Sequence, residues 1–326
     1  MSVTFRSFAK INLGLRIGAL RSDGFHELRT VYQTIALHDI IRVQVTRGTG
    51  IAIRCDDPRV PKDESNTCYR VGQAAIDALQ VRGRVMIEIE KRLPVQGGLG
   101  GASGNAVAAL LALERVVQRK LAGPERLRIV AQTGSDLPLF LIGGTVLGVG
   151  HGEEVYPLPD WPAFPCVIAL PEVSVSTPMA FAEWDKKVVK LTRSHPSDRM
   201  LEFSRMLGAW LSNQSDRCSG RRLSGVSGSR GRAETPLLDL VHTGIENDFE
   251  QVVFPQYPEL HEIKRVLEKT GALYASLSGS GSAVYGLFRS RPEAQAALAL
   301  LKKRGTGAVL TSTLTRRQYW RKISDC

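Results

Sequence analysis

Hydrophobic and polar residues alternate in several stretches of the first half of the chain, and this pattern predicts β-strands. Residues 3–18 form the longest such stretch, and Ile40–Thr46, Ile51–Cys55 and Val85–Glu90 follow with the same period of two. Alternate side chains of a strand point to opposite faces, so each stretch would bury one face against a core. The N-terminal part of the chain is therefore predicted to be rich in strands.

Between and after these strands, apolar residues recur at helical spacing. Cys68–Leu79 and Ala106–Val117 show this period, and Pro124–Thr133 predicts a further helix. Gly134 would end that helix as a C-cap, which places Asp136 on the connection that follows. Catalytic groups often lie on such connections, so Asp136 is a candidate functional residue.

The second half of the chain alternates between strand-like and helix-like segments. A glycine-rich stretch, 143–152, precedes it, and its alternating Thr, Val and Leu residues predict a strand pair rather than a phosphate site. The elements expected after it are a strand at Val167–Leu170, helices at Asp248–Phe254 and Pro258–Thr270, strands near Leu273–Ser276 and Ala283–Phe288, a helix at Pro292–Lys303 and a strand near Ala308–Thr313. This alternation predicts a compact α+β half.

The length of 326 residues and the hydrophobic content of 43% indicate about two domains with ample cores. We expect an N-terminal domain over residues 1–158 and a C-terminal domain over 159–326. Residues 213–234 are a mixture of Ser, Gly and Arg that cannot bury a core. They are expected to form a mobile loop within the second domain.

Charge and cysteine content exclude several classes of protein. A net charge of +11 would suit nucleic acid, an anionic membrane surface or polyanionic small molecules, but no zinc finger or RNP motif is present. The five cysteines are scattered without a Cys-x-x-Cys pair, so neither a disulfide framework nor a zinc site is expected. No apolar leader opens the chain, and its longest apolar run, Leu137–Gly150, is too short and too rich in Gly and Pro to cross a bilayer. The expectation is a soluble, cytoplasmic protein.

Residues 94–105, Pro-Val-Gln-Gly-Gly-Leu-Gly-Gly-Ala-Ser-Gly-Asn, form the most informative segment, which we call the glycine loop. Five of its twelve residues are Gly, and a helix predicted to start at about Ser103 would add its own unpaired N–H groups. Such a loop can hold a phosphate. A Walker A loop would need a Lys, and a dinucleotide-binding turn would need a third Gly where Ser103 stands. A phosphate cradle of another kind and a glycine-rich surface loop without ligand both remain possible from this segment alone.

Two further segments favour the phosphate cradle. Residues 9–15 read Ala-Lys-Ile-Asn-Leu-Gly-Leu, and residues 276–284 read Ser-Leu-Ser-Gly-Ser-Gly-Ser-Ala-Val. With the glycine loop, they resemble in order and spacing the three motifs of the GHMP kinase superfamily. The resemblance implies a two-domain α+β fold, an S5-like domain followed by a ferredoxin-like domain, with the site in the cleft between them.

Within the superfamily the chain is most similar to the branch that phosphorylates the 2-hydroxyl of 4-diphosphocytidyl-2-C-methyl-D-erythritol. The segments that carry this are 23–28, Asp-Gly-Phe-His-Glu-Leu, 65–67, Ser-Asn-Thr, and 134–138, Gly-Ser-Asp-Leu-Pro. The implied reaction consumes ATP with Mg²⁺ and belongs to the non-mevalonate route to isoprenoid precursors. A kinase of another small alcohol, of the homoserine or mevalonate type, is the alternative, and a basic RNA-binding protein is a more remote one.

The resemblance assigns catalysis to Lys10 and Asp136. An ammonium group beside a carboxyl favours its ionised form, which could accept the proton of a substrate hydroxyl. The same ammonium would offset charge on the transferred group. On spacing alone, both residues could be ordinary surface charges.

The resemblance also assigns binding residues. Phe25 would stack on the cytosine and His26 would hydrogen-bond its edge. For ATP the implied residues are Gly97, Gly98, Leu99, Gly100, Gly101, Ala102, Ser103, Asn66 and Arg92, and for the substrate Asn12, Phe25, His26, Thr177, Gly279 and Ser280. No metal held by the protein is expected beyond an ion that arrives with the nucleotide. Partners other than the small-molecule substrate, whether nucleic acid or membrane, are not expected, and the protein would be a monomer or homodimer.

Four positions depart from the family pattern. Phe25 stands where the family usually has Tyr, so stacking is retained but a phenol oxygen is lost. Ala102 and Gly104 stand where Gly and Ser are frequent, and Gln96 stands where Gly is common. None of these removes a backbone N–H, so the cradle is expected to persist.

Overall fold

The computed structural model describes residues 2–190, 196–218 and 245–324, and these divide into two compact units. Unit 1 comprises residues 1–11, 32–158 and 311–326, and unit 2 comprises residues 12–31 and 159–310. Two consecutive domains, 1–158 and 159–326, are the sequence-based prediction. The contacts group residues 12–31 with unit 2 and residues 311–326 with unit 1.

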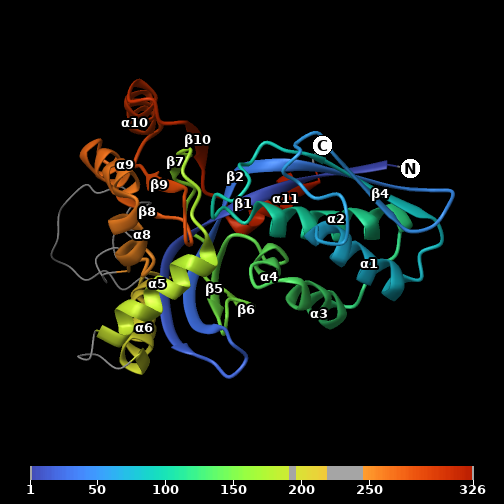
Figure 1. Ribbon diagram of the computed structural model, residues 1–326, viewed down its shortest axis with the longest axis horizontal. Coiled ribbons are helices and arrows are strands. Elements are labelled where there is room, and N and C mark those ends of the chain that lie inside the picture. The colour runs from blue at the N-terminus through green and yellow to red at the C-terminus, as the bar shows by residue number, and fades with distance from the viewer. Residues whose placement is uncertain (1, 191–195, 219–244, 325–326) are drawn as a thin grey trace. The chain divides into compact units, whose positions relative to one another are not determined.

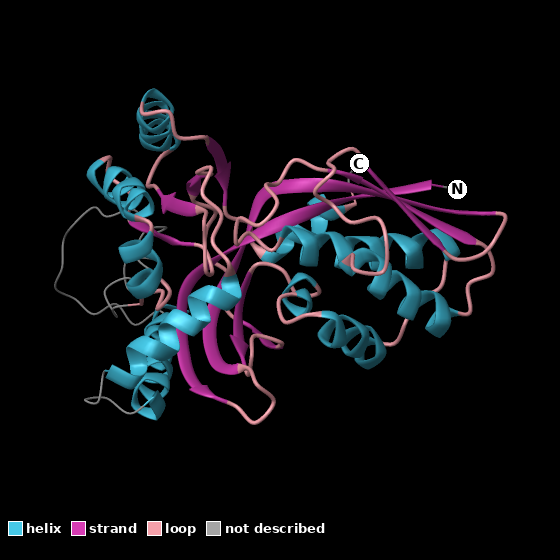
Figure 2. Cartoon of the chain, viewed as in Figure 1, coloured by secondary structure: helices cyan, strands magenta, loops and turns pink. Residues whose placement is uncertain are grey.

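Unit 1 is built on a mixed sheet (Figures 1 and 2). Its strands run in the order β3-β4-β2-β5-β6, with β1 also paired to β2. They are β1 (Ser2–Leu20), β2 (His26–Thr46), β3 (Ile51–Cys55), β4 (Arg84–Glu90), β5 (Thr145–Val149) and β6 (Glu154–Pro157). The residues of β1 and β2 are shared between the units at the boundaries given above.

The register of β2 and β4 sets the position of the glycine loop. The two strands are antiparallel, and Ile40 lies opposite Glu90. Asp39 precedes Ile40 and Lys91 follows Glu90, so both stand at the same end of the pair, where β4 passes into the glycine loop. The sheet thereby brings a carboxylate of β2 to the base of that loop.

Helices cover the sheet of unit 1 and close its core. They are α1 (Thr67–Leu79), α2 (Gly101–Val117), α3 (Gly123–Thr133), the short α4 (Leu137–Phe140) and α11 (Arg316–Ile323). α2 contacts α1 and α4, and its run of alanines and leucines is almost wholly buried. The core includes Ile41, Val43, Ile87, Leu110 and Phe140. Burial of such side chains is the main stabilising contribution to a fold of this kind.

The helix α11 was not predicted from the basic sequence at the end of the chain. Thr315 caps it in a capping box with Gln318, which satisfies two backbone N–H groups at its start. Tyr319 and Ile323 are buried in the core of unit 1, whereas Arg321 is exposed. Tyr319 and Ile323, four residues apart, thus lie on the buried face of the helix, whereas Trp320 and Arg321 are exposed.

Unit 2 contains a four-stranded sheet in the order β10-β7-β9-β8. Its strands are β7 (Pro165–Ala169), β8 (Tyr274–Leu277), β9 (Val284–Leu287) and β10 (Ala308–Ser312), and its helices are α5 (Thr177–Lys190), α6 (Pro196–Cys218), α8 (Glu250–Gln256), α9 (Pro258–Lys269) and α10 (Arg291–Lys303). α9 packs on β8 and β9, and α10 packs on β7. The α+β class predicted from the sequence is confirmed.

Several local predictions need correction. α2 begins at Gly101 with Gly100 as its N-cap, so Ser103 lies inside the first turn and is not the cap. The prediction that Gly134 caps the C-terminus of the helix is confirmed, although its φ of 173° is extended and not left-handed. β5 pairs with Glu154–Pro157, so the second strand of the pair lies beyond 143–152. Residues 213–218, predicted as part of a loop, are the last turns of α6, and residues 219–234 of that prediction lie outside the described residues.

Of the helices in the described ranges, none combines the length and apolar character needed to cross a membrane.

Candidate active site

The glycine loop borders a cavity of about 340 Å³ in unit 1. The cavity is lined by segments 59–61, 65–68 and 94–103, together with Ile89, Lys91 and Asn105. All seven residues 97–103 predicted to bind the nucleotide phosphates therefore face one cavity. Asn66 also lines it, but Arg92 is not among its lining residues.

Positive φ angles shape the loop. Gly98 has φ of +70° and Gly100 of +68°, a region that only glycine enters without strain. Gln96 has φ of +65° although it carries a side chain. A glycine at this position would adopt the positive φ with less conformational strain, which agrees with the glycine that is common there in the family that the sequence resembles.

The start of α2 supplies donors for an anion. The first intrahelical hydrogen bond runs from the Gly104 N–H to the Gly100 carbonyl at 2.8 Å. The N–H groups of residues 101–103 precede it, and such groups have no partner within a helix. They lie at the positive end of the helix dipole and line the cavity, an arrangement suited to phosphate oxygens.

Lys10 and Asp136, the predicted catalytic pair, form an ion pair. Lys10 Nζ lies 3.2 Å from Asp136 Oδ2, and the two side chains are 4% and 32% exposed. The Lys10 N–H donates to the Leu99 carbonyl at 2.9 Å, which ties β1 to the glycine loop. A β-carbon at Gly100 would lie 3.0 Å from Lys10 Cγ, so the glycine loop packs directly on the lysine side chain.

The pair is partly open to solvent, and it lies beside the phosphate cradle rather than inside the cavity. The Lys10 ammonium is buried, whereas the Asp136 carboxylate is about one third exposed, so the pair presents its carboxylate to solvent. The structure thus brings together residues that are 126 positions apart in the chain, as the motif assignment predicts.

Asp39 is a residue that sequence reasoning missed. It is fully buried, and its Oδ2 accepts hydrogen bonds from Lys91 Nζ at 2.5 Å and from Asn105 Nδ2 at 2.9 Å. Its Oδ1 accepts from the N–H groups of Arg92 and Leu93, each at 2.7 Å. One carboxylate therefore holds the end of β4 and the first turns of α2 together. Only its place just before a predicted strand could have pointed to it, and that signal is weak.

The two residues outside the glycine loop that were predicted to bind ATP, Asn66 and Arg92, have different roles in the structure. Asn66 caps α1 by accepting from the Cys68 N–H at 2.8 Å, and its Nδ2 donates to the Pro61 carbonyl at 2.6 Å. Arg92 is exposed and pairs with Glu90 at 2.6 Å. Lys91, its neighbour, lines the cavity, as does Arg59. A role for Arg92 in nucleotide binding stays a prediction.

Cys68 also lines the cavity. Burial raises the pKa of its thiol to about 12, and Lys91 opposes this only in part. The thiol is therefore neutral at physiological pH and is not a nucleophile.

The predicted cytosine residues lie at the start of β2 in unit 2. Phe25 is 56% exposed. His26 is buried, stacks on Phe181 with centroids 5.1 Å apart, and places Nε2 3.2 Å from Asp185 Oδ1. Its Nδ1 lies 3.1 Å from the Gly18 carbonyl. To hydrogen-bond a cytosine edge through Nε2, His26 would have to give up its contact with Asp185. The exposed Phe25 and the buried His26 therefore differ in how readily they could contact a base.

Thr177 and Ser280, both predicted to bind substrate, meet in unit 2. Their hydroxyl oxygens are 2.7 Å apart. Asn12 is buried and donates from Nδ2 to the Thr30 hydroxyl at 2.8 Å. The first and last of the three motifs thus each contribute a polar side chain to unit 2.

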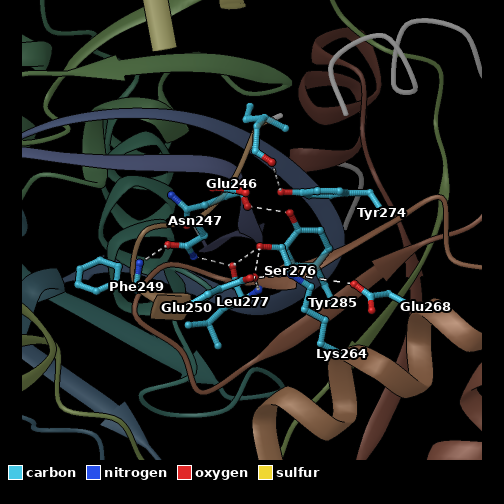
Figure 3. A network of polar contacts seen from close by, with 12 residues as sticks. Glu246, Asn247, Phe249, Glu250, Lys264, Glu268, Tyr274, Ser276, Leu277 and Tyr285 are labelled. Atoms are coloured by element: carbon cyan, nitrogen blue, oxygen red, sulfur yellow. Dashed lines mark hydrogen bonds and ion pairs between the residues drawn. The ribbon is translucent and has the colours of Figure 1, made fainter. Parts of the chain in front are cut away.

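Asn247 and Glu250 hold the third motif in place, and neither was singled out from the sequence. Figure 3 shows the network that they form with Ser276, Leu277 and Tyr285. Asn247 Nδ2 donates to the carbonyls of Leu277 at 2.9 Å and Gly279 at 2.8 Å, the residues at the start of the turn. Glu250 Oε1 accepts from the Ser276 hydroxyl at 2.7 Å and the Leu277 N–H at 2.9 Å.

The same network reaches β1. Tyr285 donates its hydroxyl to the Asn12 carbonyl at 2.7 Å, and Tyr274 donates to the Leu13 carbonyl at 2.8 Å. Burial raises the pKa of both tyrosines, so they remain protonated donors. The backbone beside Asn12 is therefore fixed by side chains of unit 2.

Comparisons with known proteins agree with this geometry. The profile of the GHMP kinases N terminal domain matches residues 66–144, and that of the GHMP kinases C terminal region matches residues 234–307. A 4-diphosphocytidyl-2-C-methyl-D-erythritol kinase from Solibacter usitatus is 37% identical over 321 residues, which cover 97% of this chain and 91% of that protein. A kinase of the same name from Acaryochloris marina is 35% identical, with 90% of this chain and 89% of that protein covered.

This chain belongs to the GHMP kinases. It is accordingly an enzyme that phosphorylates a small alcohol with ATP as the phosphate donor. A crystal structure of a 4-(cytidine 5'-diphospho)-2C-methyl-D-erythritol kinase matches this GHMP kinase with a TM-score of 0.69 and 27% identity, over 95% of this chain and 98% of that one. A homoserine kinase from Cytophaga hutchinsonii matches with a TM-score of 0.68 at 20% identity, over 96% and 95%, and shares the fold.

The first prediction concerns Gly100. Gly100→Val should abolish ATP binding in this GHMP kinase, because the new side chain would meet Lys10 and Phe140, each 3.0 Å from the β-carbon position, and would strain a φ of +68°. Isothermal titration with ATP measures the effect. Gly123→Val is the matched control, since a β-carbon there meets nothing within 4 Å. Equal ATP affinity in both variants would mean that the loop does not bind the phosphates.

The second prediction concerns Asp39. Asp39→Asn removes the charge opposite Lys91 and sets an amide N–H₂ against groups that are all donors. We expect a loss of about 3–5 kcal/mol in the free energy of unfolding, typical of a broken buried ion pair, and weaker ATP binding. Urea denaturation measures the first and calorimetry the second. Asp77→Asn, at an exposed position of α1, is the control. If Asp39→Asn is as stable as the control, the carboxylate does not hold the loop.

Proposed function

We propose that this GHMP kinase transfers the γ-phosphoryl group of ATP to the 2-hydroxyl of 4-diphosphocytidyl-2-C-methyl-D-erythritol, in the non-mevalonate route to isoprenoid precursors. The observation that carries the proposal is the Lys10–Asp136 ion pair packed against the glycine loop, which borders a nucleotide-sized cavity. The relatives that are 35% and 37% identical carry the name of this activity.

The roles of the pair follow from its chemistry. Asp136 would accept the proton of the substrate hydroxyl. The oxygen of that hydroxyl would bond to the γ-phosphorus of ATP as the bond from the γ-phosphorus to the departing ADP breaks. Lys10, held by the Asp136 carboxylate and by the backbone contact to Leu99, would offset charge on the transferred group. Phosphoryl transfer requires mainly positioning and electrostatics, and this pair provides both.

The residues of the cavity fit ATP. The helix-terminal N–H groups of 101–103 suit phosphate oxygens, and the walls at 59–61 and 65–68 provide apolar and polar surface for a base. Within the described ranges, no cluster of three or more His, Cys, Asp or Glu residues could hold a metal by itself. This fits Mg²⁺ bound mainly by the ATP phosphates, with the Ser103 hydroxyl as a neighbour. When bound, Mg²⁺ would neutralise phosphate charge.

Selectivity for a cytidine substrate rests on Phe25. Its exposed ring can stack a pyrimidine, a feature that a homoserine or mevalonate kinase does not need. The fold does not distinguish between these substrates, because a homoserine kinase matches it almost as well as the cytidine kinase does.

We also propose Asn12, Thr177, Gly279 and Ser280 as substrate contacts. We further propose that the enzyme is cytoplasmic, acts as a monomer or homodimer and has no nucleic-acid partner.

The decisive assay is ATP turnover by the purified enzyme. The cytidine diphosphate substrate is compared with homoserine and mevalonate at equal concentrations. Turnover confined to the cytidine compound supports the proposal, and preferred turnover of either other alcohol would replace it.

Asp136→Asn should lower kcat by about 10²–10⁴-fold, the range for a positioned acid–base group. ATP affinity should stay near that of the wild type, because Asp136 lies outside the lining of the cavity. Steady-state kinetics and ATP titration measure the two quantities. Near-normal turnover in a folded Asp136→Asn enzyme would remove this residue from the mechanism.

Phe25→Ala should raise the KM for the cytidine substrate more than that for ATP, because a stacked ring contributes about 1–3 kcal/mol per base. His26→Ala should act in the same direction, and its burial against Phe181 should also lower the melting temperature. Leu20→Ala is a control, as Leu20 is similarly exposed close to Phe25 in the chain. An equal rise of both KM values in Phe25→Ala would indicate a structural role and would favour another alcohol.

A further inference from the structure

A buried tyrosine contacts the Asp136 carboxylate. Tyr32 on β2 is 2% exposed, and its hydroxyl donates to Asp136 Oδ1 at 3.0 Å. Lys10 Nζ lies 3.2 Å from the other oxygen, Oδ2, and 5.6 Å from the centroid of the Tyr32 ring. The Tyr32 hydroxyl therefore contacts one oxygen of the carboxylate, and the Lys10 ammonium contacts the other.

Two contacts on different oxygens define the orientation of a carboxylate. The terminal torsion of an aspartate is broad, and a lysine ammonium is a point charge that does not fix the carboxylate plane. Asp136 precedes the short helix α4 and makes no side-chain cap to its backbone. The hydroxyl of Tyr32 supplies the directional contact that the lysine lacks.

The turn after β5 leaves room for this hydroxyl. Gly152 has φ of +105°, and a β-carbon there would lie 2.6 Å from the Tyr32 hydroxyl oxygen. The turn is itself fastened beside Asp136, because His151 Nδ1 lies 2.7 Å from the hydroxyl oxygen of Ser135. Gly152 belongs to the second glycine-rich segment, for which phosphate binding offers no explanation.

We propose that Tyr32 is a positioning residue for phosphoryl transfer, whose hydroxyl orients the Asp136 carboxylate, and that Gly152 provides the space this contact requires. The inference rests on the proposed function in so far as Asp136 is the proton acceptor. Burial, and then the charge of Asp136, raise the pKa of Tyr32 well above its ordinary value, so the phenol stays a donor throughout the working pH range.

The groups that face this site are Lys10, Tyr32, His151 and Glu153. Only the hydroxyl differs between the wild type and Tyr32→Phe, so a comparison of the two isolates its effect from the titration of His151. Loss of a hydrogen bond to a carboxylate disfavours the charged form. The acid limb of the kcat profile must then move to higher pH.

The test is a double-mutant cycle of Tyr32→Phe and Gly152→Ala, with Tyr156→Phe on β6 as a control at a half-exposed position. Tyr32→Phe should lower kcat by about 10–100-fold, the range for a hydrogen bond to a charged group, with unchanged ATP affinity. Gly152→Ala should lower kcat in the wild type and have a smaller effect in the Tyr32→Phe background, since the clash with the hydroxyl is then absent. Backbone strain at φ of +105° is common to both backgrounds and cancels.

An unchanged kcat and acid limb in Tyr32→Phe would overturn the proposal for Tyr32, and independent effects of the two substitutions would overturn the role of Gly152. Carbon-13 NMR titration of the Asp136 carboxyl gives a readout without turnover, and its midpoint should rise in Tyr32→Phe but not in Tyr156→Phe. If the wild type does not phosphorylate the cytidine substrate, the proposed function fails while this titration still decides the contact.

Discussion

The buried carboxylate of Asp39 is the constraint on which the cavity beside the glycine loop of unit 1 depends. It joins the middle of β2 to the segment that follows β4 and to the first turns of α2 through four hydrogen bonds, one of them from Lys91. A buried charge is costly unless it is fully paired, so these segments are stable together in one arrangement. The conformation of the glycine loop follows from where its two ends are held.

In unit 2, side-chain hydrogen bonds hold a different glycine-containing turn in a similar way. Asn247 and Glu250 satisfy carbonyl, N–H and hydroxyl groups around residues 276–279, and two tyrosines extend the network to the backbone of β1. In both units a flexible, glycine-rich segment is stabilised by polar side chains from a distant part of the chain. Glycine allows each segment to adopt an unusual backbone conformation, and the surrounding polar side chains hold it in that conformation.

The Lys10–Asp136 pair, for which we propose a catalytic role, is held differently from these anchors. Lys10 is buried and fastened to the glycine loop through its backbone, whereas Asp136 is one third exposed and stands before a helix of four residues. The proposed proton transfer from a substrate to Asp136 requires access to its carboxylate, which the enclosed Asp39 does not have. The orientation of the Asp136 carboxylate therefore depends on individual contacts, with Lys10 on one oxygen and Tyr32 on the other.

The sequence by itself determined the strands and helices with clear periodicity, such as Ile51–Cys55, and the three motifs with Lys10 and Asp136, because these depend on local spacing and on glycine. Only the tertiary structure decided that Asp39 meets Lys91, 52 residues away, that Tyr32 meets Asp136, 104 residues away, and that Asn247 holds the third motif. The structure also places the start of α2 at Gly101 and shows that Lys91 and Arg59, but not Arg92, line the cavity. A buried polar side chain takes its role from partners that packing brings to it, and no local pattern encodes those partners.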